Sequence, residues 1–113
     1  MQRTAAVAAE QCDPWDDPEG ARWASEMLRA VAHPLRLRII AALAERDQTV
    51  NELATLLDST QSMISQQLRI LRMSRLVDVT RAASFAHYRL VEPALRGLLN
   101  CIRRCSSHGA GRA

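Results

Sequence analysis

The spacing of hydrophobic residues changes twice along this chain, and these changes limit the folds it can adopt. Up to residue 71 the hydrophobic residues recur every three or four positions, which is typical of amphipathic helices. Between residues 76 and 90 they follow a period near two on both sides of a turn at residues 82–84, which is typical of a β-hairpin. Helical spacing returns after Pro93. The pattern predicts a mainly α fold that contains one small β-hairpin.

Capping signals divide the helical part into short segments. Asp17-Pro18 is a typical helix start, and His33-Pro34 ends the first helix and begins the second. Thr49 with Glu52 three residues later is a capping-box pattern, and Ser59 is the expected N-cap of the fourth helix. The expected helices cover about residues 17–32, 34–45, 49–57, 59–71 and 93–106. Their apolar faces are expected to consist of Trp23, Met27, Leu28 and Val31; Leu35, Ile39, Ala42 and Leu43; Leu53, Leu56 and Leu57; Ile64, Leu68 and Leu71; and Leu95, Leu98, Leu99 and Ile102.

The length of 113 residues fits one domain, which we expect at residues 17–106 between flexible tails at 1–16 and 107–113. Hydrophobic residues make up 48% of the chain and aromatic residues only 4%, so intrinsic disorder is excluded and the core must be aliphatic. Residues 1–10 lack a signal-peptide pattern, and no apolar run is long enough to span a membrane. The expected location is cytoplasmic, where cysteines are more often thiols or metal ligands than disulfides.

The third and fourth helices, separated by a turn of two or three residues, form a helix-turn-helix pattern. The exposed face of the fourth helix carries small hydrogen-bonding side chains first and arginines further along, an arrangement suited to base edges and phosphates. The candidate DNA-binding residues are Ser59, Gln61, Ser62, Ser65, Gln66, Arg69, Arg72 and, on the hairpin, Arg81. An ordinary solvated helix face would look similar, but the hairpin that follows at once is the natural place for a wing. All fifteen basic residues are arginines and the net charge is +3, which is compatible with a nucleic-acid partner.

Three segments, in this order, resemble the ArsR/SmtB family of metal-sensing repressors. Residues 31–43 (VAHPLRLRIIAAL) are similar to the family's second helix, residues 59–71 (STQSMISQQLRIL) to its recognition helix, and residues 87–90 (HYRL) to its second wing strand. The resemblance implies a winged helix-turn-helix repressor that binds double-stranded operator DNA. It also implies a homodimer built from the first and last helices, whose apolar stripes lie outside the helix-turn-helix core.

The chain departs from the family pattern at two places. Ser74-Arg75 stands where the family usually has Ala-Gly, although glycine would adopt a left-handed backbone there more easily than Arg75. The wing tip is Ala82-Ala83-Ser84, with only Arg81 and Arg89 nearby, where the family often has glycine and several basic residues.

Cys101 and Cys105 are four residues apart and therefore share one face of the last helix, while Cys12 lies in the N-terminal tail. Three thiolates suit arsenic(III) or antimony(III), and a tetrahedral zinc or cadmium site would need a fourth ligand such as His108. The chain resembles family members with arsenic-binding cysteines on the last helix, so we expect arsenic(III) or a similar thiophilic ion as inducer and no organic cofactor.

Other interpretations of the cysteines remain open. Helical neighbours at this spacing have Cβ atoms about 5–6 Å apart, more than the roughly 3.5–4.5 Å of a disulfide. A metalloid or inserted sulfur atoms would bridge that gap better, so reactive-sulfur or redox sensing is an alternative. Both cysteines also belong to an apolar stripe and would serve equally well as small packing residues in a repressor without cysteine-based sensing.

An enzyme and a protein-binding module are the two other classes of function to compare with a DNA-binding repressor. An enzyme is not expected, because the chain has no Gly-rich phosphate loop, nucleophile elbow or HExxH motif. Winged helices can also bind proteins through the same surface, and salt-dependent DNA binding is the observation that separates that class from a DNA-binding one.

Overall fold

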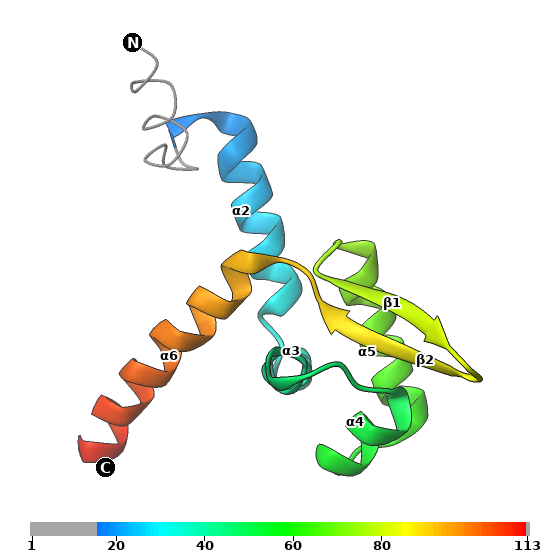
Figure 1. Ribbon diagram of the computed structural model, residues 1–113. Coiled ribbons are helices and arrows are strands. Elements are labelled where there is room, and N and C mark those ends of the chain that lie inside the picture. The colour runs from blue at the N-terminus through cyan, green and yellow to red at the C-terminus, as the bar shows by residue number, and fades with distance from the viewer. Residues whose placement is uncertain (1–15, 113) are drawn as a thin grey trace, which may run out of the picture.

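The computed structural model describes residues 16–112, with side chains described up to residue 105. Figure 1 shows a small group of helices with a two-stranded hairpin on one side, and two helices that extend away from it. The elements are α2 (Pro18–Val31), α3 (Pro34–Glu45), α4 (Val50–Leu56), α5 (Gln61–Met73), β1 (Val77–Ala82), β2 (Phe85–Leu90) and α6 (Pro93–Arg112). The expected order of four helices, a hairpin and a final helix is confirmed, and this is a winged helix-turn-helix fold.

Local capping signals set the first two helix starts as expected. The Asp17 carboxylate accepts a hydrogen bond from the Gly20 backbone N–H, and Pro18 occupies the first helical position. His33 caps α3, since its Nδ1 lies 3.2 Å from the Leu35 backbone nitrogen. Proline follows each cap, where its missing N–H costs nothing.

The core is aliphatic, as the composition predicts, and α3 lies at its centre, in contact with α2, α5, α6 and β2. Its fully buried large side chains are Ile39, Ile40, Leu43, Leu53, Ile64, Leu68, Leu71 and Leu95. One expected member is wrong, because Leu56 is 58% exposed. The buried residues of this segment are Leu53, Ala54 and Leu57. With about 100° of rotation per residue, Leu56 lies to one side of the face that they form.

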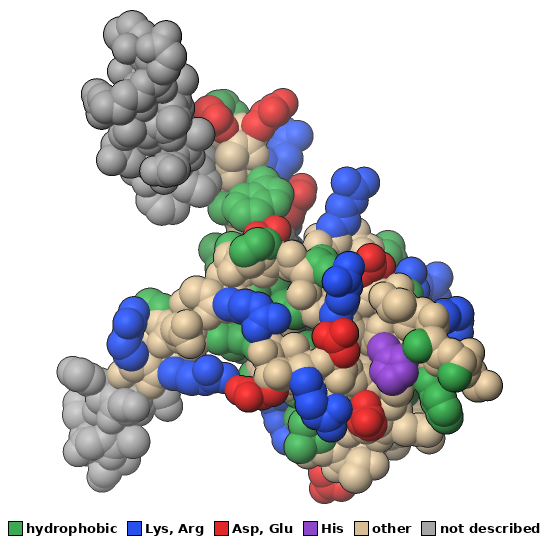
Figure 2. Space-filling view, viewed as in Figure 1, with side chains coloured by type: hydrophobic (Ala, Val, Ile, Leu, Met, Phe, Trp, Pro, Cys, Tyr) green, Lys and Arg blue, Asp and Glu red, His purple; other side chains and the backbone are tan. Residues whose placement is uncertain are grey.

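The first and last helices extend beyond the core. The radius of gyration is 16.6 Å, above the roughly 13 Å of a compact domain of this size. On the extended parts, Trp23 is 47% exposed, Leu28 48% and Ile102 44%, although all three belong to apolar stripes. Figure 2 shows hydrophobic side chains uncovered along α2.

The first half of helix α6 contacts the rest of the domain. Its Leu95 is buried, and Arg96 Nη1 donates to the Ala44 carbonyl oxygen at the end of α3, 2.7 Å away. Arg103 Nη2 lies 3.8 Å from Glu45 Oε2. The helix then continues to Arg112, beyond the end expected near residue 106. No helix within residues 16–112 has the length and apolar character needed to cross a bilayer.

Candidate nucleic-acid interface

The turn between α4 and α5 is closed by backbone hydrogen bonds. Asp58 is in the left-handed region with φ 53°, and its N–H donates to the Thr55 carbonyl at 3.4 Å. The Ser59 N–H donates to the Ala54 carbonyl at 2.9 Å. These two bonds form a Schellman motif that ends α4 and turns the chain sharply into α5.

This turn corrects one expected cap. Ser59 closes α4 and does not cap α5; Thr60 does, with its hydroxyl oxygen accepting from the Met63 N–H at 3.0 Å. The expected cap is wrong by one residue because two neighbouring hydroxyl residues carry the same capping signal, and the closing bonds of the preceding helix decide between them.

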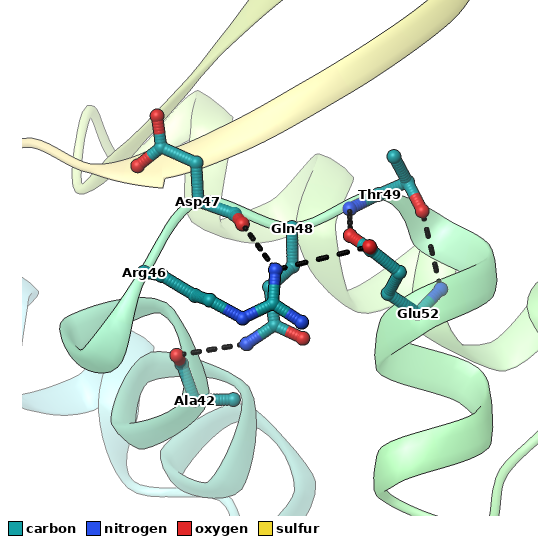
Figure 3. A network of polar contacts seen from close by, with 6 residues as sticks. All are labelled: Ala42, Arg46, Asp47, Gln48, Thr49 and Glu52. Carbon is teal, nitrogen blue, oxygen red and sulfur yellow. Dashed lines mark hydrogen bonds and ion pairs between the residues drawn. The ribbon is translucent and has the colours of Figure 1, made fainter.

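The start of α4 is fixed by the expected capping box, drawn in Figure 3. The Thr49 N–H donates to Glu52 Oε1 at 2.8 Å, and the Glu52 N–H donates to the Thr49 hydroxyl oxygen at 3.2 Å. Arg46 Nη1 lies 3.8 Å from Glu52 Oε2. The Thr49 N–H and, to a smaller extent, the Arg46 charge hold the pKa of Glu52 below its ordinary value.

Gln48 connects the helix-turn-helix to the hairpin. Its side chain is buried and donates from Nε2 to the Ala42 carbonyl on α3 at 2.9 Å (Figure 3). Its backbone exchanges two hydrogen bonds with Tyr88 of β2, at 3.0 and 2.8 Å. The end of α3, the start of α4 and the hairpin are therefore held in one unit.

Helix α5 has a buried and an exposed face, as expected. Ile64, Leu68 and Leu71 are at most 1% exposed. The opposite face contains only neutral and basic side chains, and the helix has no acidic residue. Exposed candidate DNA-binding residues on this helix are Gln61, Ser62, Ser65, Gln66, Arg69 and Arg72, whereas Ser59, in the preceding turn, is half-buried.

A partly buried polar pair, which was not expected from the sequence, holds α5 against α3. Gln67 is only 6% exposed, and its Oε1 accepts from Arg36 Nη1 at 2.9 Å. Arg36 Nε also donates to the Ala30 carbonyl of α2 at 2.5 Å. The sequence did carry one sign of this pair: Gln67 is a polar residue beside Leu68 on the apolar face of α5, where a buried side chain needs a hydrogen-bond partner.

A second left-handed residue, Arg75, lies between α5 and the hairpin. Arg75 has φ 62°, its N–H donates to the Arg72 carbonyl at 2.9 Å, and the Leu76 N–H donates to the Leu71 carbonyl at 3.0 Å. This second Schellman motif explains why glycine is favoured at this position. The strands then pair in antiparallel register from Val77↔Leu90 to Ala82↔Phe85. Arg81 is exposed near the tip.

The two cysteines of α6 are free and exposed, one helical turn apart. Among the side chains that the structure describes, no group of three or more His, Cys, Asp or Glu residues could hold a metal ion. Cys12 and the side chain of His108, the other candidate ligands, lie outside the described residues. The expected site of Cys12, Cys101 and Cys105 therefore remains a prediction.

Two short helices joined by a tight turn and followed by a β-hairpin define a winged helix-turn-helix protein. The family model described as "Bacterial regulatory protein, arsR family" matches residues 33–79. The crystal structure of the transcriptional repressor BigR from Xylella fastidiosa is 32% identical, with a TM-score of 0.72, over 75% of this chain and 87% of that chain. The chain belongs to the ArsR family.

Two curated relatives agree with this assignment. The biofilm growth-associated repressor of Agrobacterium fabrum is 38% identical over 67% of this chain, and the transcriptional repressor SmtB homolog of Synechocystis is 35% identical over 78%. The chain spans 65% and 64% of the length of these two relatives. Both relatives are named as repressors.

Proposed function

We propose that this protein is a transcriptional repressor that binds double-stranded operator DNA as a homodimer. The observation that carries the proposal is the exposed face of α5, which has amide, hydroxyl and arginine side chains and no carboxylate. Gln66 is suited to a bidentate contact with adenine in the major groove, while Arg69 and Arg72 lie further along, where phosphates are expected. The names of the relatives support this function.

A second copy of the chain would cover the apolar surfaces of α2 and α6. Trp23, Leu28 and Ile102 are each more than 40% exposed in the single chain. Covering them in a two-fold dimer would place two copies of α5 on one side of the assembly, where they would read a pseudo-palindromic site. The proposed setting is the cytoplasm, where operator DNA is accessible.

For the inducer, the proposal is a thiophilic species, with arsenic(III) first. The thiols of Cys101 and Cys105 are exposed and lie on the helix assigned to the dimer interface. Each thiol would replace one hydroxide of arsenous acid, giving one S–As bond and one water molecule, and Cys12 would supply a third thiol. Such a bond network would change how the two α6 helices pack and therefore the spacing of the two α5 helices.

The test is fluorescence anisotropy of the reduced, anaerobic protein on DNA from its own upstream region, titrated with arsenite. We expect near-stoichiometric arsenite to weaken binding about 5- to 150-fold, the range of typical allosteric coupling. Cys101→Ser should bind DNA normally and lose the response, whereas Asn100→Ser, a neighbouring exposed change that leaves both thiols, should keep it.

Different outcomes separate the parts of the proposal. A normal arsenite response in Cys101→Ser would place the site elsewhere. Tight DNA binding that arsenite does not change would keep the repressor and reject this inducer, and persulfides, cadmium and zinc would be titrated next. Weak binding that does not depend on salt would contradict the repressor itself, because phosphate contacts release counterions.

A further inference from the structure

The tip of the hairpin presents an aromatic ring to solvent. Phe85, the one phenylalanine of the chain, is 58% exposed. It pairs with Ala82 at the last rung of the hairpin, beside the two-residue loop of Ala83 and Ser84. Ala83 has φ 57°, so the chain turns through a strained left-handed residue at this point.

The register determines which side chains accompany the ring. Paired residues of an antiparallel hairpin share a face, so Phe85 lies on the face of Ala82, Thr80 and His87. Arg81 lies on the opposite face with Ala86. From residue 79 to residue 91 the chain contains two arginines and no carboxylate. At the tip itself, one face therefore carries the apolar pair Ala82 and Phe85, followed by Thr80 and His87, and the other face carries one cation, Arg81.

The hairpin projects from the rest of the domain. Figure 1 shows β1 and β2 running beside α5, with their connecting loop beyond the helices. In the same view, hydrophobic side chains reach the surface at this end of the molecule (Figure 2). More than half of Phe85 is exposed, so the ring is free to enter a groove next to the one that α5 would occupy.

We propose that Phe85 is the principal DNA contact of the wing and packs in the minor groove, against sugars and the edges of a base step. This inference rests on the proposed DNA binding and adds a residue that determines specificity. An apolar wedge partly unstacks the step that it contacts, so it favours easily deformed pyrimidine–purine steps. The ring reads deformability and not a pattern of hydrogen bonds.

This role differs from a phosphate contact in a measurable way. A phosphate contact releases a counterion, so its loss reduces the slope of log K against log salt by about 0.9. Burial of an apolar ring releases none. Loss of Phe85 should therefore weaken binding by the same factor at every salt concentration, while loss of Arg81 should flatten the slope.

The experiment measures DNA affinity by anisotropy between low and high salt for the wild type, Phe85→Ala, Phe85→Leu and Arg81→Ala. We expect Phe85→Ala to bind about tenfold more weakly with an unchanged slope, in line with the burial of one aromatic side chain. Phe85→Leu should retain most of the affinity. Because the ring is exposed, all variants should show the circular dichroism spectrum of the folded wild type.

A second measurement reports on the base step itself. Footprinting first locates the DNA under the wing, and 2-aminopurine is then placed at a TA or CA step there. Wild-type binding should increase its fluorescence through unstacking, and Phe85→Ala should not. Wild-type affinity and slope in Phe85→Ala, with the same fluorescence change, would overturn the role of the ring while leaving DNA binding intact. A wild type without salt-dependent DNA binding would instead refute the proposed function.

Discussion

Within residues 16–112, three non-glycine residues, Asp58, Arg75 and Ala83, have positive φ angles, and all three lie at turns of the candidate interface. Asp58 and Arg75 each follow a helix in a Schellman motif, and Ala83 turns the wing. A left-handed conformation costs an L-residue roughly 1–2 kcal/mol relative to glycine. For Arg75 this conformation could be predicted, because the family pattern that the sequence resembles has glycine there; for Asp58 the signal was an aspartate in the expected turn, a residue type that adopts this conformation more readily than most.

Replacing Arg75 by glycine should stabilise the domain. The relief of the left-handed strain exceeds the roughly 0.4–1 kcal/mol that the added freedom of the unfolded chain costs, so we expect a net gain of up to about 1 kcal/mol. Urea denaturation measures it. Arg75→Ala is the matched control, since it removes the same side chain but keeps the strain. If the backbone at residue 75 stores no strain, Arg75→Gly will instead be less stable than Arg75→Ala by the roughly 0.4–1 kcal/mol of the added freedom of the unfolded chain.

At the scale of elements, boundaries set by neighbouring residues were predictable. The start and end of α3 and the Thr49–Glu52 capping box agree with expectation, because proline and capping side chains act within one helical turn. The cap of α5 and the exposed position of Leu56 were not predicted correctly. Both depend on how α4 ends and on which of its sides meets the core.

The capping box should make stability depend on pH. The Thr49 N–H lowers the pKa of Glu52 in the folded state below its unfolded value, so the stability that the ionised carboxylate adds is complete above the unfolded pKa. It is lost as the pH falls through the lowered folded-state pKa. Glu52→Gln keeps an acceptor oxygen for the Thr49 N–H but does not titrate.

We therefore expect the wild type to lose more stability than Glu52→Gln between about pH 6 and pH 3, measured by urea denaturation at each pH. Other carboxylates titrate in both proteins and cancel in the difference. If the two pH profiles run parallel, the negative charge of Glu52 adds nothing to the stability of the fold.

At the scale of the whole molecule, the structure shows apolar surface that one chain leaves uncovered. Ile102 continues the stripe that begins with the buried Leu95 and Leu99, yet it is 44% exposed because α6 has left the core by that point. The stripe itself was predicted from its spacing. The spacing did not predict that the first part of the stripe packs within the chain while the part at Ile102 stays available to a partner.

Ile102→Glu should convert the proposed dimer to a monomer without unfolding it, because the side chain contacts little of its own core. Sedimentation velocity should show the lower mass, and the affinity for a full operator should fall towards that for a half-site. Leu56→Glu is the control: it places the same charge at a different exposed aliphatic residue, on α4, away from α2 and α6. A dimeric Ile102→Glu protein would exclude this part of α6 from the interface.

The sequence by itself determined the order of elements, most helix starts and the composition of the core, because caps, turn residues and hydrophobic periods act over a few neighbouring positions. It also identified the exposed face of α5, since an amphipathic period assigns each residue to one side. Only the tertiary structure placed Gln67 against Arg36, Gln48 between α3 and β2, and Phe85 in solvent at the wing tip. These arrangements join residues far apart in the chain or depend on what lies opposite a side chain, and both are decided by how the elements pack.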